Sequence, residues 1–139
     1  MQTRECLGLG QAQRAIAAVL EEATRQGKPM AVAVVDDRGD PIASARMDGV
    51  PERVLRFALR KAYTAAVMGR DTLVFKKLLV DTGRTLADYG DPMFTTLQGG
   101  LTVTVDGRVV GGFAVGGNTV TGDEEVARVG LRALMEEKK

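Results

Sequence analysis

The sequence predicts an α+β protein in which an antiparallel sheet is covered by helices. Two pairs of strand-like segments, each joined by a short turn, are the first observation. Segments with apolar residues at helical spacing are the second. The elements follow one another as helix, strand, strand, helix, a weaker helical segment, strand, strand and helix, an order typical of such a sheet. We expect residues 1–139 to form a single domain, because a chain of this length can bury about two thirds of its unfolded surface.

Residues 8–26 predict the first helix, and a strand pair follows it. Apolar residues recur at helical spacing in this range, and Gly27 is a typical helix stop. An unbroken apolar run at 30–35 and a second strand-like segment at 42–47 flank the turn-forming residues 36–41. Two paired antiparallel strands are therefore expected.

A second helix is expected over residues 52–68. Pro51 suits the first turn of a helix, and neither Pro nor Gly follows until Gly69. The signals then weaken across residues 71–100, where 73–80 could form a short helix. Because thirty residues of bare loop would be unusual in a compact domain, we expect short helical turns and a packed surface loop there.

The last part of the chain predicts a hairpin and a final helix. Residues 101–105 alternate at period two, and the Asp-Gly pair at 106–107 favours a two-residue type I′ turn before a returning strand at 109–115. Thr121 and Glu124 have the spacing of a capping box and precede a helical apolar pattern.

The composition excludes several classes of partner. The 19 Lys and Arg residues balance 18 Asp and Glu residues, so a net charge of +1 provides no field that would hold nucleic acid or an anionic membrane surface. No run approaches the ~20 apolar residues of a membrane span. We expect neither nucleic acid nor a membrane as partner.

Cysteine and histidine usage limits the chemistry. Cys6 is the only cysteine, which excludes an internal disulfide and, with no apolar segment after Met1, predicts a cytoplasmic protein. Histidine is absent, which removes the commonest general base and the commonest nitrogen ligand for metals. We expect no metal site, and any catalysis must use other side chains or the backbone.

Charged residues concentrate on the second predicted helix. At about 100° per residue, Arg53, Arg56 and Arg60 lie opposite the apolar sector and form a solvated stripe. Lys61 lies at the edge of the apolar sector instead, beside Val54. Two interpretations stay open: the Lys61 amine reaches along apolar surface to water, or it is partly desolvated and faces a pocket.

Arg46 and Asp48 lie where the second predicted strand ends. They could form a salt bridge and a turn, or they could converge with other side chains on a ligand. Arginine offers a planar fork for a carboxylate or phosphate, and lysine adds a point charge. Arg46 and Lys61 together could therefore hold a small anion.

Glycines bracket the second predicted hairpin. Gly111 and Gly112 indicate a bulge or a close approach by another backbone or subunit. Gly116 and Gly117 could form an anion-binding nest before the last helix, although the acidic residues 123–125 occupy the positive end of that helix and repel a second anion. Structural use of these glycines is favoured over phosphate binding.

Four motifs resemble the GlcG and HbpS-like family, labelled haem-degrading or haem-binding, which also occurs as the C-terminal domain of PduO-type corrinoid adenosyltransferases. They are VAVVDDRGDPIASARMDG, RKAYTAAVMGRDT, VDGRVVGGFAVGG and DEEVARVGL, in family order. The resemblance implies a profilin-like fold with about five antiparallel strands, helices on both faces and homo-oligomers from dimers to octamers. It also implies haem as a cofactor in some relatives, but His-ligated haem is excluded here. Two positions depart from the family pattern, where Thr102 replaces a proline and Gly116 replaces a serine.

These observations support several hypotheses. The first is a cytoplasmic homo-oligomer that binds a small organic anion or cofactor-like ligand. The second is a small-molecule catabolic enzyme of isomerase or lyase type, with proton transfer by Lys61 or Asp48. The third is a protein that binds haem without histidine ligation, and the fourth is a structural or accessory subunit. Positions that match the family motifs make up the expected ligand site: Arg46, Lys61, Thr64, Gly99, Gly100 and Gly117.

Overall fold

The helices and strands follow the predicted order. The computed structural model describes residues 5–117 and 120–136. The last helix begins one residue before Thr121, so Thr121 lies inside it, and the side chain of Thr121 lies outside the described part of the chain. The elements are α1 (Leu9–Gln26), β1 (Ala31–Asp36), β2 (Pro41–Arg46), α2 (Glu52–Met68), α3 (Thr72–Thr82), η1 (Leu86–Tyr89), β3 (Gly100–Val105), β4 (Arg108–Gly116) and α4 (Val120–Met135).

The two predicted hairpins join into one antiparallel sheet. Within the described residues the sheet has four strands in the order β2-β1-β4-β3, so the expectation of about five strands is wrong. The chain between the hairpins forms α2, α3, η1 and loops, and it lacks the alternating apolar pattern of a further strand. Asp106 and Gly107 have φ angles of 52° and 76°, which confirms the predicted type I′ turn.

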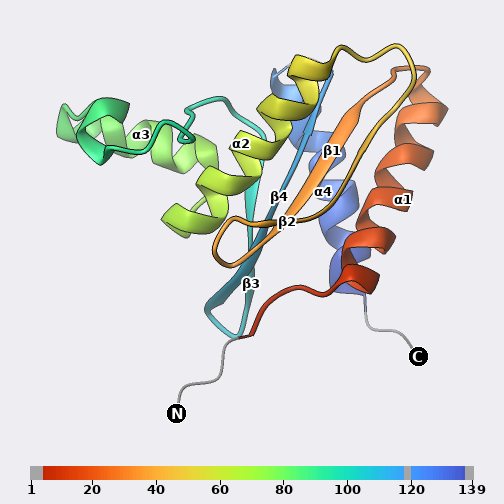
Figure 1. Cartoon of the computed structure of the whole chain (residues 1–139), viewed down its shortest axis with the longest axis horizontal. Coiled ribbons are helices and arrows are strands. Elements are labelled where there is room, and N and C mark those ends of the chain that lie inside the picture. Colours follow the sequence, from red (N-terminus) through yellow and green to blue (C-terminus); the bar gives the residue numbers. More distant parts are fainter. Residues whose placement is uncertain (1–4, 118–119, 137–139) are drawn as a thin grey trace.

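Helices cover both faces of the sheet (Figure 1). Helices α1 and α4 pack side by side on one face, and α2 packs across the other. Strand β1 is buried on both faces: Val32 and Val34 join the core beneath α1 and α4, while Ala33 and Val35 face α2. This double burial explains the unbroken apolar run that predicted β1.

Small residues let α2 approach the sheet closely. The core beneath α2 consists largely of alanines, among them Ala58 and Ala62. A Cβ atom added at Gly112 would lie 2.2 Å from the Ala62 carbonyl oxygen. Of the alternatives left open for this glycine, the structure shows a close approach by another backbone, that of α2.

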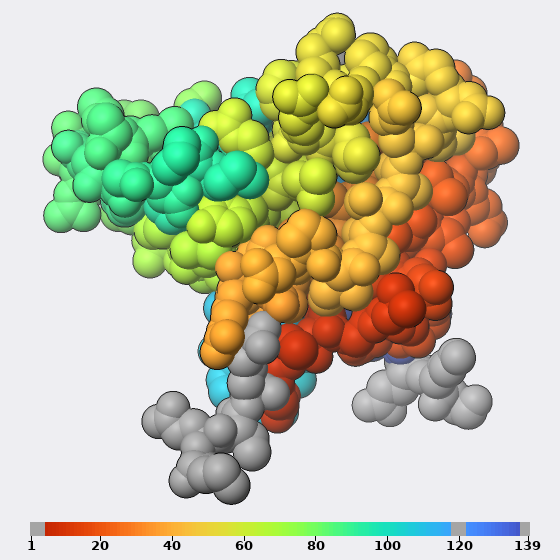
Figure 2. Space-filling model, viewed as in Figure 1, coloured from red at the N-terminus to blue at the C-terminus, as the bar shows by residue number. Residues whose placement is uncertain are grey.

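Helix α3 extends from the body of the protein with its own small core. Phe75, Leu79 and Phe94 form this cluster, with Tyr63 and Tyr89 packed against it. In the space-filling view the α3 and η1 segments form a lobe beside the rest of the molecule (Figure 2). Among the described residues, no helix is long and apolar enough to cross a membrane.

Candidate functional site

The candidate site is a hollow of about 280 Å³ between α2, the end of β4, the start of α4 and the loop before β3. We call it the Lys61 hollow. It lies where three distant parts of the chain meet, so no single motif marks it. The described residues that line it are Val54, Phe57, Lys61, Leu97, Gln98, Gly116, Gly117 and Asp123.

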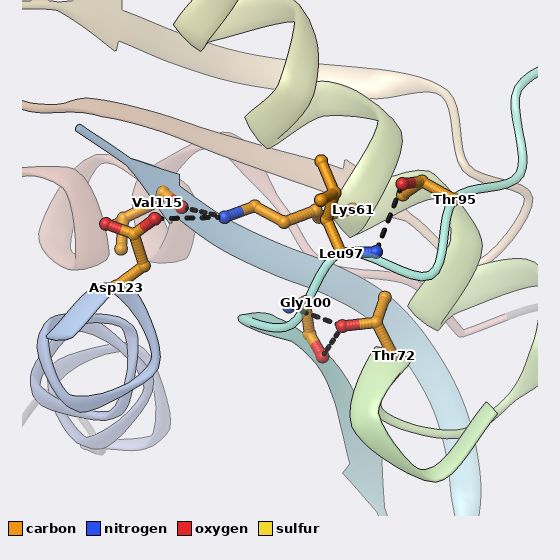
Figure 3. Close-up of polar contacts among 7 residues, drawn as sticks. All are labelled: Lys61, Thr72, Thr95, Leu97, Gly100, Val115 and Asp123. Atoms are coloured by element: carbon orange, nitrogen blue, oxygen red, sulfur yellow. Dashed lines mark hydrogen bonds and ion pairs between the residues drawn. The ribbon is translucent and has the colours of Figure 1, made fainter. Parts of the chain in front are cut away.

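Lys61 is buried in the middle of α2. Only 3% of the residue is exposed, so the interpretation that its amine reaches water is wrong. Its Nζ donates to the Val115 carbonyl oxygen at 2.5 Å and lies 3.5 Å from Asp123 Oδ2 (Figure 3). Lys61 is therefore a buried amine that borders a hollow.

Asp123, in the first turns of α4, carries the charge opposite to that of Lys61. It is 7% exposed and pairs with Lys61 across 62 positions of sequence. Burial lowers the pKa of the Lys61 amine from its ordinary value of 10.5, because desolvation disfavours the ammonium form, while the Asp123 carboxylate opposes the shift. The sequence placed Asp123 at a helix start but contained no signal that it pairs with Lys61.

Threonine hydroxyls position the loop that forms one wall of the hollow. Thr64 is fully buried on α2, and its hydroxyl accepts a hydrogen bond from the Thr95 amide at 3.0 Å. The Thr95 hydroxyl accepts from the Leu97 amide at 3.2 Å. Thr72 accepts from the Gly100 amide at 3.0 Å, which anchors the end of the loop (Figure 3). In this structure Thr64 therefore holds the wall and is not among the residues that line the hollow.

Glycines leave room around the amine. A Cβ atom at Gly99 would lie 3.1 Å from Lys61 Nζ, and one at Gly116 would lie 2.9 Å from Val54 Cγ1. Gly117 also lines the hollow. The serine that the family pattern has at position 116 would therefore crowd Val54, and Gly116 does not.

Arg46 and Asp48 lie outside the lining of the Lys61 hollow. Arg46 is exposed at the end of β2, and its Nη1 donates to the Val50 carbonyl oxygen at 3.2 Å. Asp48 is exposed in the turn that follows. The sequence analysis expected these two residues to lie with Lys61 in one site. The structure does not place them in the hollow.

Arg60 differs from its neighbours in the predicted solvated stripe. Arg53 and Arg56 are exposed, but the Arg60 guanidinium donates to three backbone carbonyl oxygens, those of residues 92, 93 and 94. A second hollow of about 270 Å³ lies beside it, lined mainly by apolar surface. Because its guanidinium already has these partners, Arg60 holds the loop and presents no obvious group for chemistry.

The described residues contain no cluster of three or more His, Cys, Asp or Glu side chains that could hold a metal ion. Cys6 is exposed near the N-terminus and does not line the hollow. The chemistry of this site therefore depends on one amine, one carboxylate, the Gln98 amide and backbone groups.

Comparisons with known proteins agree with the family resemblance that the four sequence motifs indicated. The sequence profile of the family described as haem degrading protein HbpS-like matches residues 7–132. Protein GlcG of Escherichia coli K12 is 36% identical over 115 residues, which span 83% of this chain and 84% of GlcG. Streptomyces reticuli HbpS, solved as a double mutant, is 31% identical with a TM-score of 0.88, over 98% of this chain and 92% of HbpS. A complex of PduOC with haem is 25% identical with a TM-score of 0.81, over 92% and 94% of the two chains. Because the sequence profile covers nearly the whole chain and the folds superpose, this chain belongs to the HbpS-like family.

Proposed function

We propose that this protein binds a small organic anion in the Lys61 hollow. One observation carries the proposal: an amine that is 3% exposed borders a space of about 280 Å³. An ion pair is stronger where water is excluded, so a buried ammonium group is an effective partner for a carboxylate.

The lining indicates what kind of anion would fit. An ammonium group has three N–H donors, and the Val115 carbonyl and the Asp123 carboxylate account for two of those on Lys61. The third N–H would donate a hydrogen bond to the carboxylate of a ligand. Val54, Phe57 and Leu97 supply apolar surface for a short hydrocarbon body. A small carboxylic acid combines these features.

Thermal unfolding in the presence of short carboxylates tests the proposal. Propionate and lactate are expected to raise the melting temperature of the wild-type protein, since a ligand that binds only the folded state at 100 times its Kd stabilises it by about 2.7 kcal/mol. The rise should disappear in Lys61→Met and persist in Lys77→Met, which removes an exposed amine. Equal stabilisation of both variants would contradict the proposal.

A second candidate is an enzyme of isomerase or lyase type that transfers a proton at the same hollow. The pairing of an amine of lowered pKa with a buried carboxylate favours it, because burial of this kind tunes groups for acid–base catalysis. Loss of turnover in Asp123→Asn with ligand affinity retained would support the enzyme. Loss of affinity alone would support binding.

Haem does not fit this hollow. The described lining contains none of the side chains that commonly ligate haem iron, which are His, Cys, Met and Tyr. The haem named for the PduOC complex therefore supports no role for Lys61 as a haem-binding residue.

The proposal includes a homo-oligomer in the cytoplasm. Exposed apolar side chains on α3, among them Val74 and Val80, support an interface between subunits. The exposed free thiol of Cys6 suits a reducing compartment.

A further inference from the structure

The arrangement at Lys61 differs from an ordinary structural salt bridge. A buried pair stabilises a protein only when its geometry is close and its remaining donors are satisfied. Lys61 Nζ lies 3.5 Å from Asp123 Oδ2, a long contact, and it borders a hollow. A close-packed pair would leave no such space beside the amine. The Lys61 amine thus has one close backbone acceptor, the Val115 carbonyl oxygen, a more distant carboxylate and open space beside it.

We propose that Lys61 forms an imine with the carbonyl carbon of a small aldehyde or 2-oxo acid bound in the hollow. The inference rests on the proposed function in that the ligand occupies the same hollow, and it adds the chemical class of the ligand.

The reaction balances without an oxidant or a reductant. The lone pair of the neutral Lys61 amine attacks the carbonyl carbon, and the π electron pair of the C=O bond moves to oxygen. The Asp123 carboxylate accepts one proton from the new ammonium nitrogen and delivers it to this oxygen, which gives the carbinolamine. A proton from water then converts the hydroxyl group into water, which leaves while the nitrogen lone pair forms the C=N bond. The remaining N–H proton passes to the hydroxide left by that water, so the products are the imine and one water molecule.

Lys61 is the described lysine whose environment suits this step. Lys28, Lys76 and Lys77 are exposed. Burial lowers the pKa of the Lys61 amine, so a larger fraction of it is neutral and nucleophilic near neutral pH. Asp123 is the charged side chain in the described lining that faces this amine, and its carboxylate limits the shift without reversing it.

The walls of the hollow suit an imine. Val54, Phe57 and Leu97 place apolar surface near the reacting carbon. Gly99 presents no side chain beside Lys61, and a Cβ there would come 3.1 Å from Nζ. The tetrahedral carbinolamine carbon therefore has room next to the nitrogen.

Reductive trapping tests the inference. Wild-type protein is incubated near neutral pH with propionaldehyde or pyruvate and sodium cyanoborohydride, and the modified lysine is located by peptide mass mapping. We expect Lys61 to be alkylated several-fold faster than Lys28, Lys76 and Lys77, in line with its larger neutral fraction. Lys77→Met, checked for folding by circular dichroism, should leave the labelling of Lys61 unchanged. Labelling of the exposed lysines at the same rate as Lys61 would overturn the inference.

A matched pair of ligands separates this inference from the proposed function. Lactate and pyruvate have the same carbon skeleton, but only pyruvate has a ketone. If both raise the melting temperature and pyruvate yields no Lys61 adduct, binding stands and the imine is overturned. If neither raises it and propionaldehyde still labels Lys61 selectively, the imine stands and anion binding is overturned. If neither effect occurs, both are overturned.

Discussion

At the scale of single residues, the function proposed here depends on how Lys61 is solvated. The same side chain on an exposed helix face would be an ordinary charged group. Here its Nζ has a carbonyl oxygen at 2.5 Å and a carboxylate at 3.5 Å. Desolvation and the partner charge act in opposite directions on its pKa, and desolvation is larger. Under the two proposals, this amine binds an anion when it is protonated and reacts when it is neutral.

The lowered pKa predicts a pH dependence of stability. Lys61 holds its proton less tightly in the folded than in the unfolded protein, so the unfolded state binds more protons between the folded pKa and 10.5. Stability rises with pH wherever the unfolded state binds more protons. The free energy of unfolding of the wild type, measured in urea relative to Lys61→Met, should therefore increase as the pH rises from the folded pKa of Lys61 toward 10.5. Groups that do not contact Lys61, such as Tyr63, are common to both proteins and cancel in this difference. A difference that falls as pH rises would contradict the assignment.

Thr102 shows how a departure from the family pattern is accommodated. Its amide donates to Asp71 Oδ1 at 2.8 Å, and its hydroxyl donates to the Ala65 carbonyl oxygen at 2.9 Å. A proline at this position has no N–H to donate. Thr102 therefore links β3 to the start of α3 and to α2 through bonds that a proline could not complete.

At the scale of elements, α2 organises the site. It carries the Lys61 amine, and it also anchors the loop that forms the opposite wall. Arg60, Tyr63 and Thr64 hydrogen-bond to the segment from residue 91 to residue 95. The wall at Leu97 follows directly from that anchored segment.

Thr64→Val should loosen this wall. Valine is close in shape but leaves the buried Thr95 amide without its acceptor, which costs about 1–3 kcal/mol. We expect a lower free energy of unfolding in urea and faster amide hydrogen exchange between residues 95 and 98. Thr82→Val is the control, because the Thr82 hydroxyl donates to a carbonyl on the exposed surface of α3. Unchanged exchange in Thr64→Val would show that the hydroxyl does not hold the loop.

Gly112→Ala should disrupt the packing of α2 on the sheet. The new Cβ would meet the Ala62 carbonyl oxygen at 2.2 Å, so backbone must move, and overpacking of this kind costs about 1–3 kcal/mol or more. Gly10→Ala is a matched control in α1, where the added Cβ would reach only the end of the Arg14 side chain at 3.9 Å. It should stabilise the helix by about 0.5–1 kcal/mol. Melting temperatures that move in the same direction for both variants would argue against this packing.

At the scale of the whole molecule, the lobe formed by α3 is the candidate subunit interface. Leu73, Val74 and Val80 are 45%, 52% and 74% exposed, and exposed apolar surface of this kind is typical of an interaction site. Polar side chains such as Lys76 and Lys77 lie between them. A second copy of the chain could cover this surface while leaving the sheet core intact.

Native mass measurement tests the predicted oligomer. The wild type is expected to have the mass of two or more chains, and Val80→Lys should shift the population to smaller species, because a buried unpaired charge is costly. Asp81→Lys introduces the same side chain at the neighbouring exposed position and should have a weaker effect. A monomeric wild-type protein would remove the oligomer from the proposal.

The sequence by itself determined the elements and their pairing into hairpins. Period-two and helical patterns, the Asp-Gly turn at 106–107 and the stop signals at Gly27 and Gly69 are local, and each acts through backbone geometry within a few residues. The absence of histidine also limited the chemistry before any fold was known. The tertiary structure alone decided that Lys61 is buried, that Asp123 faces it and that Arg46 lies elsewhere. Desolvation and ion pairing depend on which distant segments come into contact. Neither produces a periodic pattern in the amino-acid sequence.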